Sequence, residues 1–209
     1  MAAAKLTRSD WIAAAVHAMG EHGVSGIAVE PLAKSLGATK GSFYWHFRDR
    51  NDLVTAALER WEQEATDAVI AKLSPVDDGR ARLRQLFQAL FVMPPPDATS
   101  PPALAVDASH RAVTISIALS VEREHPAVVE VLTRVTARRI AYVAEQFVAL
   151  GIDASEAHRR ALLAYTAYVG FSALGRSVPA AMPREADAQR FVDTMLAVLT
   201  MGSDEAVLS

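Results

Sequence analysis

Residues 39–47 read TKGSFYWHF, with four aromatic side chains in nine positions. A helix with about 3.6 residues per turn places Phe43 and Phe47, four positions apart, on one face. Tyr44 and Trp45 then point away from that face. The pattern favours a short helix that is half core and half exposed surface, although plain packing is the commoner use of such rings.

The residues before this stretch complete a helix-turn-helix pattern. Apolar residues at helical spacing predict a first helix over residues 7–23 and a second over 29–36, which ends at Gly37. Thr39 is a good N-cap for a third helix, expected to run to about Phe47. In such a motif the second helix of the pair enters the major groove of DNA.

Composition narrows the class of protein. The chain has 209 residues, of which 51% are hydrophobic and 22% charged, so it can bury a sizeable core. It has no cysteine, which excludes disulfides, thiolate catalysis and cysteine-bound zinc. Because it also lacks a signal peptide and an apolar run that could span a bilayer, we expect a cytoplasmic protein. It has no phosphate loop, HExxH or GxSxG motif, so we expect neither an enzyme nor a cofactor.

Charge is unevenly distributed. The net charge of −3 taken alone argues against a nucleic-acid-binding protein. Residues 1–50, however, carry six basic and four acidic side chains, a net charge of +2, so the remainder carries −5. The first quarter is therefore locally basic, as a surface that meets phosphate requires.

Helical periodicity continues through the rest of the chain, and no window shows the alternation of a strand. We expect an all-α fold of about nine helices: a three-helix N-terminal domain with the helix-turn-helix, residues 1–50, and a larger helical bundle, residues 51–209. The bundle helices are expected over residues 49–73, 83–91, 109–122, 126–150, 155–174 and 184–200, with a proline-rich loop at 93–102.

The run from Thr7 to Leu53 resembles the DNA-binding domain of the TetR family, the tetracycline-repressor-like bacterial transcription regulators. The resemblance rests on the opening helix and on PLAKSLGATKGSFYWHFRDRNDL, residues 31–53, above all on GATKGSFYWHF. It covers about the first quarter of the chain. One departure is that family members commonly cap the second helix with Ser or Thr, whereas Ala28 and Val29 stand here.

The resemblance and the local charge together predict which residues contact operator DNA. Tyr44 and His46 are expected to hold the phosphate backbone, and the start of the third helix to meet bases or flanking phosphates. The predicted DNA-binding residues are Lys5, Arg8, Thr39, Lys40, Gly41, Ser42, Tyr44, Trp45, His46, Arg48 and Arg50.

The resemblance also implies that the bundle binds a small molecule and dimerises through its last two long helices. Small residues along 155–174 permit close helix approach, and larger ones follow in 184–200. The predicted dimer contacts are Ala161, Tyr165, Tyr168, Phe191, Met195 and Leu199, and the predicted pocket residues are Phe87, Phe91, Ile117, Tyr142 and Phe147. Ordinary core packing would use the same side chains.

These features predict a ligand-responsive transcriptional regulator, a repressor like most of the family. It would bind a pseudo-palindromic double-stranded operator as a homodimer, without a membrane, and leave it when a small, largely apolar effector binds. The alternative is a helical metal-binding or small-molecule-binding protein without operator binding. Glu122 with His125, and Asp107 with His110, have the spacing that puts two ligands on one helical face. A di-iron site also needs two further inward glutamates, so we expect no metal.

Overall fold

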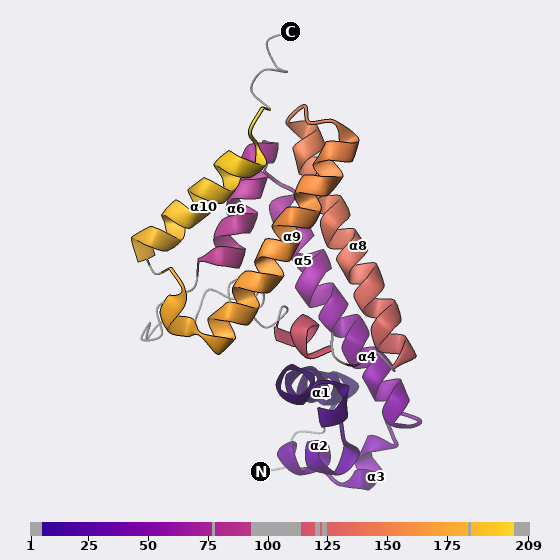
Figure 1. Cartoon of the computed structure of the whole chain (residues 1–209). Helices are drawn as coiled ribbons and strands as arrows, with labels where there is room; N and C mark the ends of the chain where they lie inside the picture. The colour runs from indigo at the N-terminus through magenta and orange to yellow at the C-terminus, as the bar shows by residue number, and fades with distance from the viewer. Residues whose placement is uncertain are drawn as a thin grey trace. The chain divides into compact units, whose positions relative to one another are not determined.

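The computed structural model describes residues 6–76, 78–92, 114–119, 122, 125–183 and 185–202 (Figure 1). All regular elements within these ranges are helical, which confirms the predicted all-α class. The elements are α1 (Arg8–His22), η1 (Val24–Gly26), α2 (Val29–Ser35), α3 (Lys40–Phe43), α4 (Arg50–Glu62), η2 (Gln63–Asp67), α5 (Ala68–Leu73), α6 (Gly79–Phe91), α8 (Pro126–Ala149), α9 (Ala154–Ser177), η3 (Pro179–Ala181) and α10 (Glu185–Leu199), and residues 114–119 are also helical. The predicted loop at 93–102, with Asp107 and His110, lies outside the described residues.

The chain forms two compact units, which we call the N-terminal unit and the C-terminal unit. The N-terminal unit consists of Met1–Glu64 and Thr114–Thr133, and the C-terminal unit of Ala65–Val113 and Arg134–Ser209. The first unit is thus larger than the domain of residues 1–50 expected from the sequence, because α4 packs against α1 and a later segment joins the same unit. Among the helices that the structure describes, none has the combination of length and apolar character needed to cross a membrane.

Aromatic packing holds the N-terminal unit together. Trp11 of α1 and Phe43 of α3 are both fully buried, and their rings meet edge to face with centroids 5.5 Å apart. Phe47 stacks on Phe43 at 5.4 Å. Leu53 of α4 is also fully buried in this unit. Burial of such large side chains is the main favourable term in folding a small unit.

Capping side chains begin the helices where the sequence predicts them. Thr7 and Asp10 form a complete capping box at α1, in which the Thr7 amide donates to Asp10 Oδ2 at 2.7 Å. Asp49 caps α4 by accepting from the Asp52 amide at 2.9 Å. Ala28 precedes α2 and offers no side-chain cap, as the sequence indicated. The start of α2 therefore lacks the side-chain cap that α1 and α4 have.

Two helix predictions need correction. The third helix, expected to reach Phe47, ends as α3 at Phe43 and is followed by a turn, in which the Phe47 amide donates to the Phe43 carbonyl at 3.1 Å. The helix expected to run unbroken from residue 49 to 73 contains a π-helical turn, η2, at Gln63–Asp67. A π turn inserts an extra residue into the helix and marks functional positions in many proteins. Nothing in its composition distinguishes this turn from the helix around it.

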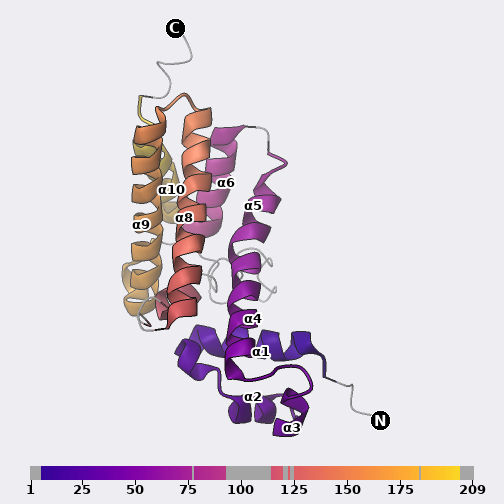
Figure 2. The same cartoon turned by 90° about the vertical axis from the view of Figure 1, so that its right-hand side faces the viewer.

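The C-terminal unit has a second aromatic core. Phe91 of α6 is fully buried, and the rings of Phe171 and Phe191 lie 5.1 and 5.5 Å from it. Phe171 and Phe191 stack on each other at 5.4 Å. Helix α6 packs against both α9 and α10, whose positions beside it can be followed in Figure 2.

Gly23, which follows α1, is enclosed by a contact that spans 98 positions of sequence. The amide of Val24 donates to Glu122 Oε1 at 2.6 Å. Gly23 has a φ of 65° and a ψ of −162°, a conformation that essentially only glycine adopts. A Cβ added at Gly23 would lie 2.0 Å from Glu122 Oε1. Glycine is therefore required here by backbone conformation and by space.

We expect Gly23→Ala to lower the free energy of unfolding by about 3 kcal/mol, because it strains the backbone and displaces the carboxylate from Val24. Gly37→Ala is the matched control, since Gly37 also has a positive φ but an added Cβ there meets nothing within 4 Å. It should cost about 1 kcal/mol. Urea denaturation measures both, and equal losses would show that the Glu122 contact contributes nothing.

Candidate nucleic-acid interface and ligand cavity

The N-terminus of α3 presents an open polar surface. Thr39 accepts a hydrogen bond from the Ser42 amide at 3.2 Å, and the Ser42 hydroxyl donates to the Thr39 carbonyl at 2.8 Å. Lys40 and Gly41, between them, are exposed. A Cβ on Gly41 would meet only Thr39 Oγ1, at 3.7 Å. The fold of the chain therefore does not itself require glycine at this position.

The aromatic residues divide between core and surface as their spacing predicts. Phe43 and Phe47 are 0% and 2% exposed, whereas Tyr44 and Trp45 are 56% and 88% exposed. A tryptophan this exposed is unusual, because a large ring gains from burial. Tyr44 and Trp45 therefore form an aromatic surface next to the start of α3.

Lys40 and Arg48 on this surface form ion pairs within the chain that are exposed to solvent. Lys40 Nζ lies 2.9 Å from Glu30 Oε1, and this hydrogen bond, with the charge of Glu30, raises the pKa of Lys40. Arg48 lies 3.6 Å from Asp52, whose pKa is lowered mainly by a hydrogen bond from the Arg48 amide. Both basic side chains are more than half exposed. Such exposed pairs are weak and screened by salt, so a phosphate can replace the carboxylate.

The prediction for Arg50 is corrected by its hydrogen bonds. Its Nε donates to the Ile27 carbonyl and its Nη2 to the Val24 carbonyl, each at 2.6 Å. Both carbonyls lie near the end of η1, so the guanidinium is directed into the N-terminal unit. Arg50 therefore supports the turn before α2 instead of presenting its charge to DNA.

Arg8 and His46, two further predicted DNA-binding residues, are described by the structure. The Arg8 guanidinium lies 4.8 Å from the centre of the Phe47 ring, in a cation–π geometry. His46 is half-buried beside the exposed Trp45. Lys5 lies outside the described residues. Their contact with DNA stays a prediction.

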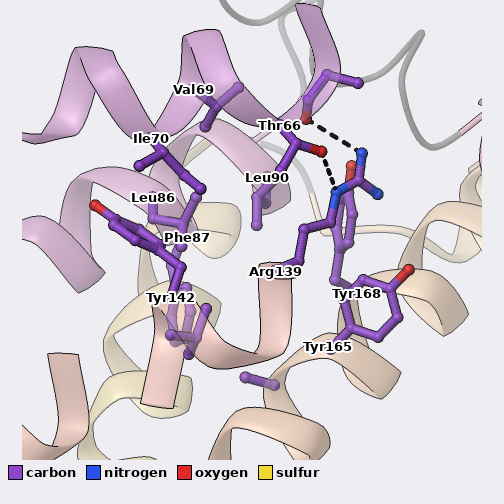
Figure 3. Close-up of a pocket in the computed structure, with 13 residues that line it drawn as sticks. Thr66, Val69, Ile70, Leu86, Phe87, Leu90, Arg139, Tyr142, Tyr165 and Tyr168 are labelled. Carbon is purple, nitrogen blue, oxygen red and sulfur yellow. Dashed lines mark hydrogen bonds between the residues drawn. The ribbon is translucent and has the colours of Figure 1, made fainter. Parts of the chain in front are cut away.

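A cavity opens inside the C-terminal unit (Figure 3). Its empty space, with the opening to solvent included, is about 640 Å³. Most of its described lining is apolar or aromatic. The lining includes Thr66 of η2, Ile70 of α5, Phe87 of α6, Arg139 and Tyr142 of α8, and Tyr165 and Tyr168 of α9.

Of the five predicted pocket residues, Phe87 and Tyr142 line this cavity. Phe91 and Phe147 are fully buried and belong to the core instead. Ile117 belongs to the N-terminal unit and is not among the lining residues. The sequence reasoning missed Arg139, because an arginine on an amphipathic helix is usually solvated.

Arg139 joins the cavity to the π turn. Its Nε donates to Thr66 Oγ1 at 3.0 Å, and its Nη2 donates to the Ala65 carbonyl at 3.1 Å. Figure 3 shows both hydrogen bonds on one side of the cavity. The side chain therefore holds the interrupted part of the long helix against α8.

The predicted dimer contacts are buried or half-buried in the C-terminal unit. Ala161, Tyr168 and Leu199 are buried, and Tyr165 and Tyr168 line the cavity. Phe191 is half-buried against Phe171, and Met195 is half-buried in α10. Side chains that close a monomer and side chains that close a dimer follow the same periodicity, and the role of these residues in a dimer stays a prediction.

The outward apolar residues of α9 and α10 are different ones. They are Leu162, Leu163, Leu174, Val198 and, just after α10, Met201, which are 47–68% exposed. Arg160 of α9 donates to the carbonyls of Leu199 and Met201 at 3.0 and 2.9 Å. It thereby brings the turn that carries Leu162 and Leu163 next to the turn that carries Val198 and Met201.

The possible metal ligands have another role where they are described. Glu122 accepts the hydrogen bond from Val24, and His125 immediately precedes α8. Within the described ranges, no group of three or more His, Asp or Glu side chains could hold a metal ion. The described residues contain a helix-turn-helix in the N-terminal unit and a cavity in the C-terminal unit.

Comparison with known proteins shows which family the helix-turn-helix part of the chain resembles. Residues 12–57 match the family described as bacterial regulatory proteins, tetR family. The transcriptional regulator AcrR of Shigella flexneri is 37% identical over 59 residues, which is 28% of this chain and 26% of AcrR. The chain spans less than half the length of the curated relatives it matches. The N-terminal part of the chain is therefore similar in sequence to the TetR family of bacterial regulators.

Solved structures extend the similarity of fold to nearly the whole chain. A transcriptional regulator from Rhodococcus sp. Rha1 has a TM-score of 0.70 at 20% identity, over 94% of this chain and 97% of that one. The regulator FadR of Bacillus subtilis, solved with stearoyl-CoA, has a TM-score of 0.62 at 12% identity, over 94% and 99%. All three of these similar proteins are described as transcriptional regulators.

Arg50 provides a test of the interface. Arg50→Met should lower the free energy of unfolding by about 2 kcal/mol, because two carbonyls lose a charged donor. Arg48→Met removes the same charge from an exposed position and should change the free energy of unfolding by less than about 0.5 kcal/mol. Urea denaturation compares the two, and equal stability of both variants would mean that the Arg50 hydrogen bonds are unimportant.

Proposed function

We propose that this chain is a ligand-responsive transcriptional regulator, and specifically a repressor. It binds a pseudo-palindromic operator as a homodimer and is released when a small, largely apolar molecule occupies the cavity. The observation that carries the proposal is the exposed surface at the start of α3, with Lys40, Tyr44 and Trp45 outward while Phe43 and Phe47 are buried.

The chemistry of this surface suits a DNA groove. A helix N-terminus with free backbone amides and a positive end attracts phosphate. Gly41 allows the backbone to approach a base or phosphate closely, although the fold does not need glycine there. Tyr44 has a hydroxyl that can donate to a phosphate oxygen, and Lys40 adds a charge. Together these features support a role for this surface in DNA binding.

A dimer follows from the outward apolar residues of α9 and α10. Leu162, Leu163, Val198 and Met201 form an unusually apolar exposed set around the turns that Arg160 joins. A two-fold dimer would place two copies of α3 in successive major grooves, about 34–36 Å apart, and so would require a pseudo-palindromic site.

The switch requires a ligand that prefers one conformation of the protein. Thr66 and Ile70 line the cavity and lie in the helical run that continues from α4, which belongs to the N-terminal unit. A ligand that favours one arrangement of this run changes the population that binds DNA, and only by as much as its affinities for the two states differ.

Operator binding is tested by titration with the intergenic DNA upstream of the gene at several salt concentrations. Lys40→Ala should weaken binding several-fold and reduce the slope of log affinity against log salt by about 1. Tyr44→Ala should weaken binding up to about tenfold without changing that slope, because it removes an uncharged hydrogen bond. Lys72→Ala, an exposed control on α5, should change neither. Wild-type binding that ignores Lys40 and Tyr44 would contradict the interface.

Dimerisation is tested by analytical ultracentrifugation at micromolar protein concentration. Leu163→Glu places a charge on the exposed apolar surface, so it should convert the dimer to monomer and weaken operator binding. Val129→Glu makes the same change at a similarly exposed position of α8 and should leave the dimer intact. A Leu163→Glu protein that still sediments as a dimer would exclude this face.

A further inference from the structure

The cavity of the C-terminal unit contains a hydroxyl that the protein does not satisfy. Tyr142 Oη is buried and has no hydrogen-bond partner among the described residues. Tyr165, another lining residue, already shares a hydrogen bond with Thr136 Oγ1 at 3.3 Å. Buried polar groups in folded proteins nearly always have a partner, so an exception suggests one that is supplied from outside the chain.

The other polar lining groups have partners of their own. Arg139 donates to Thr66 and to the Ala65 carbonyl, which commits these donors to holding the π turn. Figure 3 shows Tyr142 on the side of the cavity away from Arg139, Tyr165 and Tyr168. A polar atom that meets Tyr142 would therefore lie among apolar lining such as Ile70 and Phe87.

The hydroxyl of Tyr142 acts as a hydrogen-bond donor. Burial raises the pKa of Tyr142 above its usual value, so the phenol keeps its proton throughout the physiological range. A phenolic O–H next to apolar side chains gains most from an oxygen acceptor, since no other group there takes its proton in a hydrogen bond.

We propose that the cavity binds a compact, mostly apolar molecule with one acceptor oxygen, and that the Tyr142 hydroxyl donates a hydrogen bond to this oxygen. The inference rests on the proposed function, because it names the chemical class of the effector. Apolar contacts with the aromatic lining would supply most of the affinity, and Tyr142 would select ligands that carry the oxygen.

Two probes of nearly equal shape test the assignment: 2-acetylnaphthalene, which has one carbonyl oxygen, and 2-ethylnaphthalene, which has none. Dissociation constants for the full-length protein are measured by ligand-observed NMR titration. The ratio of the two constants cancels the difference in hydrophobicity when variants are compared. In Tyr142→Phe the preference for the carbonyl probe should fall about tenfold, because its oxygen loses a donor, while binding of 2-ethylnaphthalene stays unchanged.

Tyr165→Phe is the matched control, because the Tyr165 hydroxyl already has its partner in Thr136. It should leave the preference for the carbonyl probe unchanged. Thermal unfolding should show that Tyr142→Phe is at least as stable as wild type, since it removes an unsatisfied hydroxyl.

An unchanged preference in Tyr142→Phe would overturn the proposal and point to a water molecule as the partner of the hydroxyl. Failure of both probes to bind wild type at their solubility limits would also overturn it, by excluding this ligand class. Operator titration with the same proteins tests the proposed regulator function separately from the Tyr142 assignment. Normal probe selectivity without operator binding would refute the regulator and leave the Tyr142 assignment intact.

Discussion

The packing of Phe43 and Phe47 against Trp11 is the constraint on which the N-terminal unit depends. These three rings are almost completely buried, so the short helix α3 has only one orientation that fills the core. Tyr44 and Trp45, the neighbours of Phe43, must then face outward. The stability of the unit and the exposure of its candidate DNA surface therefore have the same cause, and a change to either phenylalanine would disturb both.

The π turn at Gln63–Asp67 provides a physical connection between the cavity and the long helix. A π turn interrupts regular helical hydrogen bonding, so its backbone and side chains are open to outside partners. Arg139 is such a partner, because its guanidinium donates hydrogen bonds to the Thr66 hydroxyl and the Ala65 carbonyl. The effector proposed for the cavity would touch the same turn, and the helical run is covalently continuous with α4. A small shift of the turn can therefore be transmitted along the helical run to α4.

Local features were predictable from the sequence, and long-range ones were not. Helical period alone separated Phe43 from Trp45, and side-chain chemistry alone identified Thr7 and Asp49 as caps. Arg50 could not be assigned, because its partners Val24 and Ile27 become neighbours only in the folded unit. Glu122, which binds Val24 from 98 positions away, was considered as a metal ligand for the same reason. Helical period also cannot assign the dimer residues, because inner and outer stripes of α9 have the same period.

The distribution of tryptophan gives this protein a built-in optical reporter. Trp11 and Trp61 are 0% and 1% exposed, whereas Trp45 is 88% exposed. A neutral quencher dissolved in the buffer would therefore reach one indole out of three, and that indole stands beside α3. Fluorescence of the quenchable fraction follows events at this surface, and the protected fraction follows the integrity of the interior. Tryptophan fluorescence of the native protein thus distinguishes binding at the α3 surface from unfolding in a single sample, without a chemical label.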